Sequence, residues 1–158
     1  LLPVARIRGR KVPLAPEFFA IIADARLALG RISEERYSCD TADGAGKDRE
    51  AALRRLARSV CAGLEEIGEA AALAIAEQAC ERQKKILVAA MERQAEKHGL
   101  TKVAAAGIGE GLIAEAAAVL GLEGIRLSEV YGARISDVFP AYAVARLAET
   151  DVAEIARD

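Results

Sequence analysis

The stretch Lys102-Val-Ala-Ala-Ala-Gly-Ile-Gly-Glu-Gly-Leu-Ile-Ala-Glu-Ala-Ala-Ala-Val-Leu-Gly121 indicates the fold class of this chain. A short apolar run meets three closely spaced glycines, and an alanine-rich helical pattern follows. The next run, Gly124-Ile-Arg-Leu-Ser128, is typical of a second short strand. Because parallel strands need a crossover connection, these runs together predict a β-α-β unit. Ligands of α/β proteins bind at the carboxyl ends of such strands, so we expect a ligand site at this turn.

The glycine turn, Gly107, Gly109 and Gly111, allows two interpretations. Glycines let the backbone approach a ligand closely and aim free N–H groups at an anion, which predicts phosphate or nucleotide binding. The alternative is structural, with glycines that only permit a tight turn from strand to helix. The spacing matches neither the dinucleotide-binding fingerprint nor the P-loop. Glu110 favours the helix dipole but repels a phosphate at the same N-terminus.

Periodicity elsewhere predicts helices joined by one long loop. The expected elements are an extended segment over 2–7 that can continue through 12 with a bend at Gly9, a helix from about Pro16 to Gly30 with Phe18 in its apolar stripe, a loop over 31–47, a helix from Asp48 to Gly63, a helix over 69–98, and a last helix from 137–140 to about Glu149. Long loops inside compact domains are uncommon and often functional.

The loop over 31–47 carries the cluster Thr41-Ala-Asp-Gly44. A hydroxyl and a carboxylate can hold Mg²⁺ through waters or orient a polar substrate, which makes Asp43 a candidate catalytic residue and Thr41 a candidate binding residue. The structural alternative is an Asp-Gly turn in which Thr41 satisfies local backbone groups. On the functional interpretation, the cluster faces the same cleft as the glycine turn.

A third candidate segment runs from Ser128 to Tyr142, between the second strand and the last helix. Ser136 or Asp137 is expected to cap that helix. Ser136 is also a candidate phosphate- or nucleotide-binding residue, and Asp137 a candidate catalytic residue. Because this helix and the glycine turn begin at the same sheet edge, we expect their N-termini to converge on one ligand.

Composition argues against several classes of function. With 22 basic and 24 acidic side chains, the net charge of −2 argues against nucleic acid as a partner. No apolar run of transmembrane length and no signal peptide pattern occur, which predicts a cytoplasmic protein without a membrane partner. Three cysteines without a C-x-x-C pair and a single histidine predict no metal site of the zinc type and no Ser-His-Asp triad.

Several stretches together resemble the hydantoinase/oxoprolinase-like proteins linked to tetrahydromethanopterin-dependent C1 transfer. They are Arg8–Pro13, Glu17–Phe19, Thr41–Gly44, Val103–Leu122, Leu127–Gly132 and Ser136–Ala145. The resemblance implies an α/β fold, the actin-like carboxyl-terminal lobe with a small, mostly parallel sheet and several helices. It also places the glycine turn where that superfamily binds adenosine. Archaeal members are similar to the methanofuran-biosynthesis synthase, which implies a transferase that joins a furan-methyl diphosphate to a phenolic acceptor.

Two departures from the family pattern shape the remaining expectations. Glu110 stands where kinases carry a small residue, which argues against ATP as a cofactor, and no Asp-x-Gly-x-Thr phosphate loop occurs. We therefore expect residues 1–158 to form a single α/β lobe that acts on a small-molecule substrate only with the missing amino-terminal lobe or a second copy. The alternatives are an ATP-dependent hydrolase or kinase-like enzyme, and a non-catalytic domain whose helix over 69–98 pairs with a partner helix.

Overall fold

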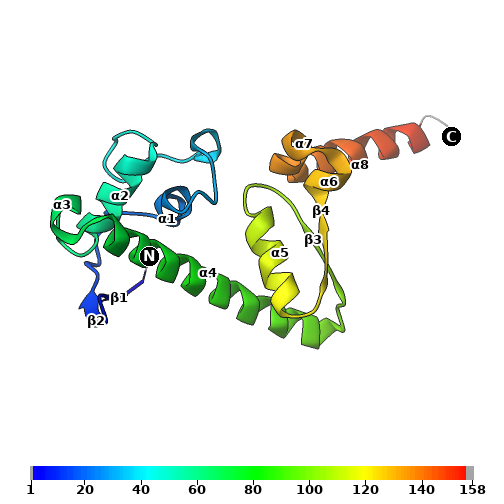
Figure 1. Cartoon of the computed structure of the whole chain (residues 1–158). Helices are drawn as coiled ribbons and strands as arrows, with labels where there is room; N and C mark the ends of the chain where they lie inside the picture. Colours follow the sequence, from blue (N-terminus) through cyan, green and yellow to red (C-terminus); the bar gives the residue numbers. More distant parts are fainter. Residues whose placement is uncertain (1, 156–158) are drawn as a thin grey trace. The chain divides into compact units, whose positions relative to one another are not determined.

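The computed structural model describes residues 2–155 and shows a mixed α/β chain that is mostly helical (Figure 1). Its backbone contacts divide the chain into two compact units, residues 1–83 and 84–158. The expectation of a single lobe stays a prediction. Among the described residues, no helix is both long enough and apolar enough to cross a bilayer.

The first unit combines a β-hairpin with four helices and the start of a fifth. Its elements are β1 Val4–Ile7, β2 Arg10–Pro13, α1 Ile22–Ala28, the 3-10 helix η1 Glu34–Arg36, α2 Arg49–Arg58, α3 Leu64–Ile67 and the first part of α4 Glu69–His98. Its core is built from small and branched apolar side chains of β1, α1, α2 and α4, including Ala5, Ala25, Leu27, Leu53, Leu56, Ile75, Ala76 and Ala79.

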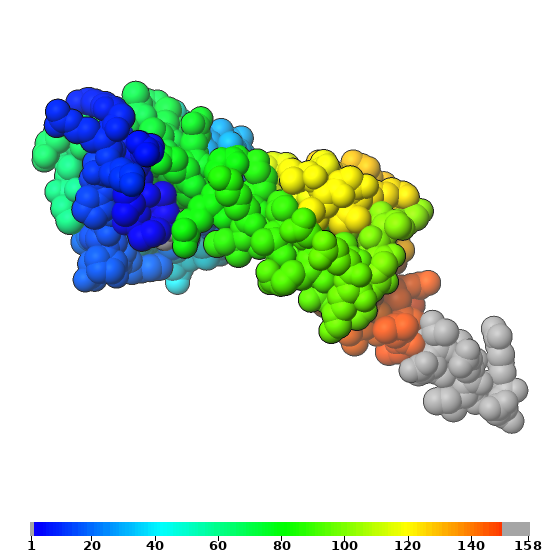
Figure 2. All heavy atoms as spheres, turned by 90° about the horizontal axis from the view of Figure 1, so that it is seen from below, coloured from blue at the N-terminus to red at the C-terminus, as the bar shows by residue number. Residues whose placement is uncertain are grey.

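The extended segment expected at the start of the chain is present, and it bends near Gly9, as expected, to form a hairpin of β1 and β2. Arg8 and Gly9 both adopt positive φ, 49° and 78°, so the chain reverses between β1 and β2. The Gln78 side chain of α4 then pairs with the β1 backbone, accepting from the Arg6 N–H (2.7 Å) and donating to its C=O (2.9 Å). Figure 2 shows the hairpin, in dark blue, beside the green α4. The amide of Gln78 thereby covers an edge that another strand would otherwise pair with.

Two helix boundaries in the first unit differ from the expected ones. The helix expected from Pro16 begins at Ile22, because the Asp24 carboxylate accepts the Ile21 N–H (2.9 Å) and defines the first turn there. Phe18 therefore lies before the helix and is 68% exposed. Asp48 does cap α2, accepting the Ala51 N–H at 2.8 Å, as expected. However, α2 ends at Arg58, before the residue predicted to end it.

The second unit contains the predicted β-α-β unit. Its elements are the rest of α4, β3 Lys102–Ala105, α5 Glu110–Val119, β4 Glu123–Arg126, α6 Leu127–Tyr131, α7 Ala133–Asp137 and α8 Phe139–Ile155. β3 and β4 pair in parallel, and α5 packs against both strands (Figure 1). The 30-residue helix α4 and the loop over residues 31–47, interrupted only by η1, are also confirmed.

Two details of the predicted fold are wrong. The strands do not form one small, mostly parallel sheet, because β1 and β2 pair antiparallel and separately from the parallel pair β3 and β4. Ser136 and Asp137 do not cap the last helix, because both lie inside the short helix α7 and α8 begins at Phe139. Gly132, with φ of 85°, separates α6 from α7, two short helices that the sequence did not predict.

Candidate functional site

The glycine turn between β3 and α5 meets helix α7 through Ser136. Gly107 adopts a positive φ of 80°, and its N–H donates to the Ser136 Oγ at 3.1 Å. The Gly107 carbonyl accepts the N–H of Glu110 at 3.0 Å, which closes the turn into the helix. The glycine turn therefore contacts the segment around Ser136, whereas convergence of two helix N-termini on one ligand stays a prediction.

The carboxylate of Glu110 occupies the point where these elements meet. Glu110 is buried, and it accepts hydrogen bonds from the Ser136 hydroxyl (2.7 Å), the Ser128 N–H (3.1 Å) and the Ser128 hydroxyl. Burial raises the pKa of Glu110, but the hydrogen bonds from Ser128 and Ser136 outweigh it and hold the pKa below its ordinary value. This carboxylate thus joins α5 to α6 and α7 and is turned away from the surface.

The structural interpretation accounts for Gly107 and for Gly109, the N-cap of α5, but not for Gly111 inside the helix. Gly109 has an ordinary φ of −79°, and a Cβ added to Gly109 or Gly111 would meet no atom within 4 Å. The N–H groups of Ile108 and Gly109 make no hydrogen bond to any residue among 2–155. Glycine inside a helix costs about 1 kcal/mol relative to alanine. The turn therefore presents an open stretch of backbone with two unpaired donors.

We expect Gly109→Val to weaken the binding of inorganic diphosphate by about tenfold or more, because a branched side chain blocks close approach to the backbone. The fold should survive, since the space around Gly109 is open. Isothermal titration calorimetry measures the affinity, and circular dichroism checks the fold. Val119→Ala at the other end of α5 is the control. Equal diphosphate affinity in the valine variant would remove Gly109 from the site.

The Thr41–Gly44 cluster forms the turn that the structural alternative describes. The Thr41 hydroxyl donates to the Ala45 carbonyl at 2.9 Å, and Asp43 Oδ1 accepts the Ala45 N–H at 3.1 Å. Asp43 also accepts from Arg55 Nη1 (3.1 Å) and Arg58 Nη1 (2.6 Å). Catalytic and metal-binding roles for this cluster, and a cleft shared with the glycine turn, stay predictions.

The pKa of Asp43 reflects these contacts. Burial raises the pKa of Asp43. The hydrogen bond from the Ala45 amide and the positive charges of Arg55 and Arg58 lower it by more than burial raises it, so the pKa lies below its ordinary value. Asp43 is therefore ionised at neutral pH and serves as an anchor that ties the long loop to α2.

Sequence reasoning did not find the buried ion pair beneath this loop. Arg55 and Asp24 are both completely buried, and Arg55 Nε donates to Asp24 Oδ1 at 2.8 Å. The Tyr37 hydroxyl donates to the same oxygen at 2.8 Å. Burial, and to a lesser extent this hydrogen bond, raises the pKa of Tyr37. The sequence signal that could have revealed this pair is that Asp24 and Arg55 each occupy a position among apolar residues on the core face of a helix.

Asp137, the second candidate catalytic residue, is exposed at the end of α7, next to the buried Ser136. Among residues 2–155, no three His, Cys, Asp or Glu side chains are grouped so that they can hold a metal ion. Participation of Mg²⁺ through Thr41 and Asp43 was expected to involve waters, and it stays a prediction.

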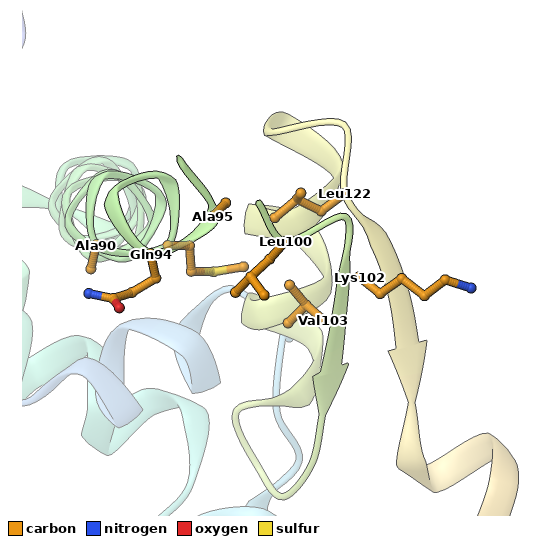
Figure 3. A pocket seen from close by; sticks show the side chains of 8 residues that line it. Ala90, Gln94, Ala95, Leu100, Lys102, Val103 and Leu122 are labelled. Atoms are coloured by element: carbon orange, nitrogen blue, oxygen red, sulfur yellow. The ribbon is translucent and has the colours of Figure 1, made fainter. Parts of the chain in front are cut away.

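Two hollows open on the surface of the second unit. The first, of about 350 Å³, lies between the end of α4 and β3 and is lined mainly by apolar side chains such as Met91, Leu100 and Val103 (Figure 3). Lys102 points away from the other side chains in this view, and its Nζ lies 2.8 Å from a Glu123 carboxylate oxygen. The second, of about 620 Å³, is formed by the end of α6, helix α7 and Val138.

The chain belongs to the hydantoinase/oxoprolinase family, whose profile matches residues 4–151. Membership of this family implies an actin-like fold. A (4-{4-[2-(gamma-L-glutamylamino)ethyl]phenoxymethyl}furan-2-yl)methanamine synthase from Methanocaldococcus jannaschii is 36% identical over 140 residues, 89% of this chain and 42% of that protein. A Methanococcus vannielii protein of the same name is 29% identical over 143 residues, 88% of this chain and 64% of that protein.

This chain is homologous to these furan-methanamine synthases, and it spans less than two thirds of the length of each. The resemblance seen in the sequence is therefore confirmed at the level of the family.

Proposed function

We propose that this chain is part of a transferase that joins a furan-methyl diphosphate to the hydroxyl of a phenol. The homology to the furan-methanamine synthases carries this proposal, because their name describes a phenoxymethyl-furan, in which a phenol oxygen is bonded to the methyl carbon of a furan. We further propose that the chain forms the carboxyl-terminal lobe of an actin-like enzyme.

The proposed reaction is a substitution at the furan-methyl carbon. The phenol oxygen forms a bond to this carbon, the carbon–oxygen bond to diphosphate breaks, and diphosphate leaves with the bonding electron pair. The phenol proton passes to a base, for which Asp43 and Asp137 are the candidates. Negative charge accumulates on the diphosphate as it leaves, so stabilising that charge lowers the barrier.

The open backbone of the glycine turn suits the leaving diphosphate. The N–H groups of Ile108 and Gly109 are unpaired among the described residues and lie at the N-terminal end of the ten-residue helix α5. Such donors, together with the helix dipole, favour an anion. The Glu110 carboxylate, which would repel phosphate, is held by Ser128 and Ser136 away from the surface. If Mg²⁺ takes part, it would neutralise diphosphate charge.

One observation also favours the ATP-dependent alternative. Because Glu110 is turned inward and a Cβ added at Gly109 or Gly111 would meet no atom within 4 Å, the backbone here is open to a nucleotide as well as to a diphosphate. An ATP-dependent hydrolase or kinase-like enzyme of the actin-like superfamily is therefore the second candidate. It differs from the first in its products, since it releases phosphate from ATP and forms no ether.

An assay of the chain alone, and mixed with the part of the Methanocaldococcus protein that it does not match, tests the proposal. We expect diphosphate release and ether formation only in the mixture, because one lobe of a two-lobed enzyme cannot exclude water from its ligand. Mass spectrometry detects the ether, and light scattering reports pairing. Phosphate release from ATP without ether would favour the alternative. Pairing without either reaction would favour a non-catalytic interaction domain.

A further inference from the structure

The hollow at α6 and α7 is lined in part by α7, the helix whose Ser136 binds Glu110 and the glycine turn. Its lining comes from Tyr131 at the end of α6, the link at Gly132, three residues of α7 and Val138. Helix α7 therefore directs Ser136 into the buried network while Arg134 and Ile135 line the hollow. Ile135, which lines the hollow, is followed directly by Ser136, whose hydroxyl binds the glycine turn.

Arg134 is the only charged side chain among the described residues that line this hollow. It is exposed, and it makes no hydrogen bond or ion pair to any residue among 2–155. The exposed Arg126 and Arg146 of the same unit, by contrast, both face a glutamate. A charged ligand of the hollow must therefore be an anion, and a guanidinium favours the planar, two-oxygen geometry of a carboxylate.

An aromatic wall stands beside this cation. The Tyr131 ring lies 5.4 Å from the Phe139 ring and 5.6 Å from the Tyr142 ring, measured between centroids, and these two rings are 5.9 Å apart. Tyr131 is 42% exposed although it packs against two other rings, so part of its surface remains open to the hollow. A ring held by its neighbours loses little conformational entropy when a second ring packs against it.

We propose that this hollow binds a phenol that carries a carboxylate, with its ring against Tyr131 and its carboxylate on Arg134. The inference rests on the proposed function, since it assigns the phenolic acceptor to a hollow lined by α7, the helix that contacts the glycine turn. The volume of about 620 Å³ accommodates a small aromatic molecule of this class.

Titration of the isotope-labelled full chain by NMR tests the subsite with two probes. Hydroxyphenylpropionate has the phenol and a carboxylate, whereas tyramine has the same phenol and an ammonium group. We expect the propionate to shift the amide signals of residues 131–138 and to bind at least about tenfold more tightly than tyramine, because only the propionate can pair with Arg134. Equal affinity for the two probes would overturn the proposal.

Variants identify the groups responsible. Arg134→Gln should reduce propionate affinity about tenfold, Arg134→Lys should keep part of it, and Arg93→Gln on α4 should leave it unchanged. Tyr131→Leu should weaken binding, whereas Tyr131→Phe, which keeps the ring, should not. An Arg134→Gln chain that binds like the Arg93→Gln chain contradicts the assignment.

The complemented assay separates this proposal from the proposed function. If the unchanged chain forms no ether in the mixture but Arg134→Gln still loses phenol binding, the proposed reaction is refuted and the subsite is supported. Ether formation with the same KM for the acceptor in Arg134→Gln supports the reaction and refutes the subsite.

Discussion

Arg55→Met is expected to lower the free energy of unfolding of the first unit by about 3 to 5 kcal/mol. The substitution leaves the Asp24 carboxylate completely buried without its cationic partner, and it also removes one of the two arginines that hold Asp43. An uncompensated buried charge costs far more than the lost attraction of the pair itself. Urea denaturation by circular dichroism, with hydrogen exchange of the α2 amides to report on this unit, measures the effect.

The neighbouring Arg54 provides the matched control. Arg54 is exposed and pairs with Glu50 one turn away, so Arg54→Met should change stability by less than about 0.5 kcal/mol. The double variant Arg55→Met with Asp24→Leu should recover part of the loss, because a buried ion pair replaced by apolar groups is often neutral. Similar losses for Arg54→Met and Arg55→Met would show that burial of the pair is not what matters.

Glu110→Ala is expected to lower the free energy of unfolding of the second unit by about 3 kcal/mol, because hydrogen bonds to a buried charged group contribute about 1.5 to 3 kcal/mol each. The variant leaves the Ser128 N–H and the hydroxyls of Ser128 and Ser136 without their acceptor. Hydrogen exchange of the α5 amides measures the loss. Glu115→Ala, at an exposed position of the same helix, should be nearly neutral.

The pH dependence of stability gives an independent check on Glu110. Its folded pKa lies below the ordinary value of 4.5, so its carboxylate binds fewer protons in the folded state than in the unfolded state. The resulting stabilisation is complete above the unfolded pKa and is lost as pH falls through the lower, folded pKa. Comparing the wild-type chain with Glu110→Gln between about pH 6 and pH 3 should therefore show a smaller acid loss in the variant. Identical profiles would contradict the role assigned to Glu110.

Local signals in the sequence were sufficient for the β-α-β unit and for the capped start of α2. The glycine turn, the alanine-rich pattern after it and Asp48 act on their immediate neighbours, so short-range geometry alone predicts β3, α5, β4 and the start of α2. Family membership was also accessible, because matching residues extend over most of the chain. The late start of α1 was not predicted, since it depends on which carboxylate accepts the Ile21 N–H.

The sequence by itself determined the strand–turn–helix unit, the long loop and the position of the open glycines, all of which depend on contacts within a few residues. Only the tertiary structure decided that Glu110 binds Ser128 and Ser136, which lie 18 and 26 positions away, and that Arg55 binds Asp24, which lies 31 positions away. A charged side chain has the same local propensity whether it is solvated or buried. Its partner is chosen when packing removes water and leaves one compensating group within reach.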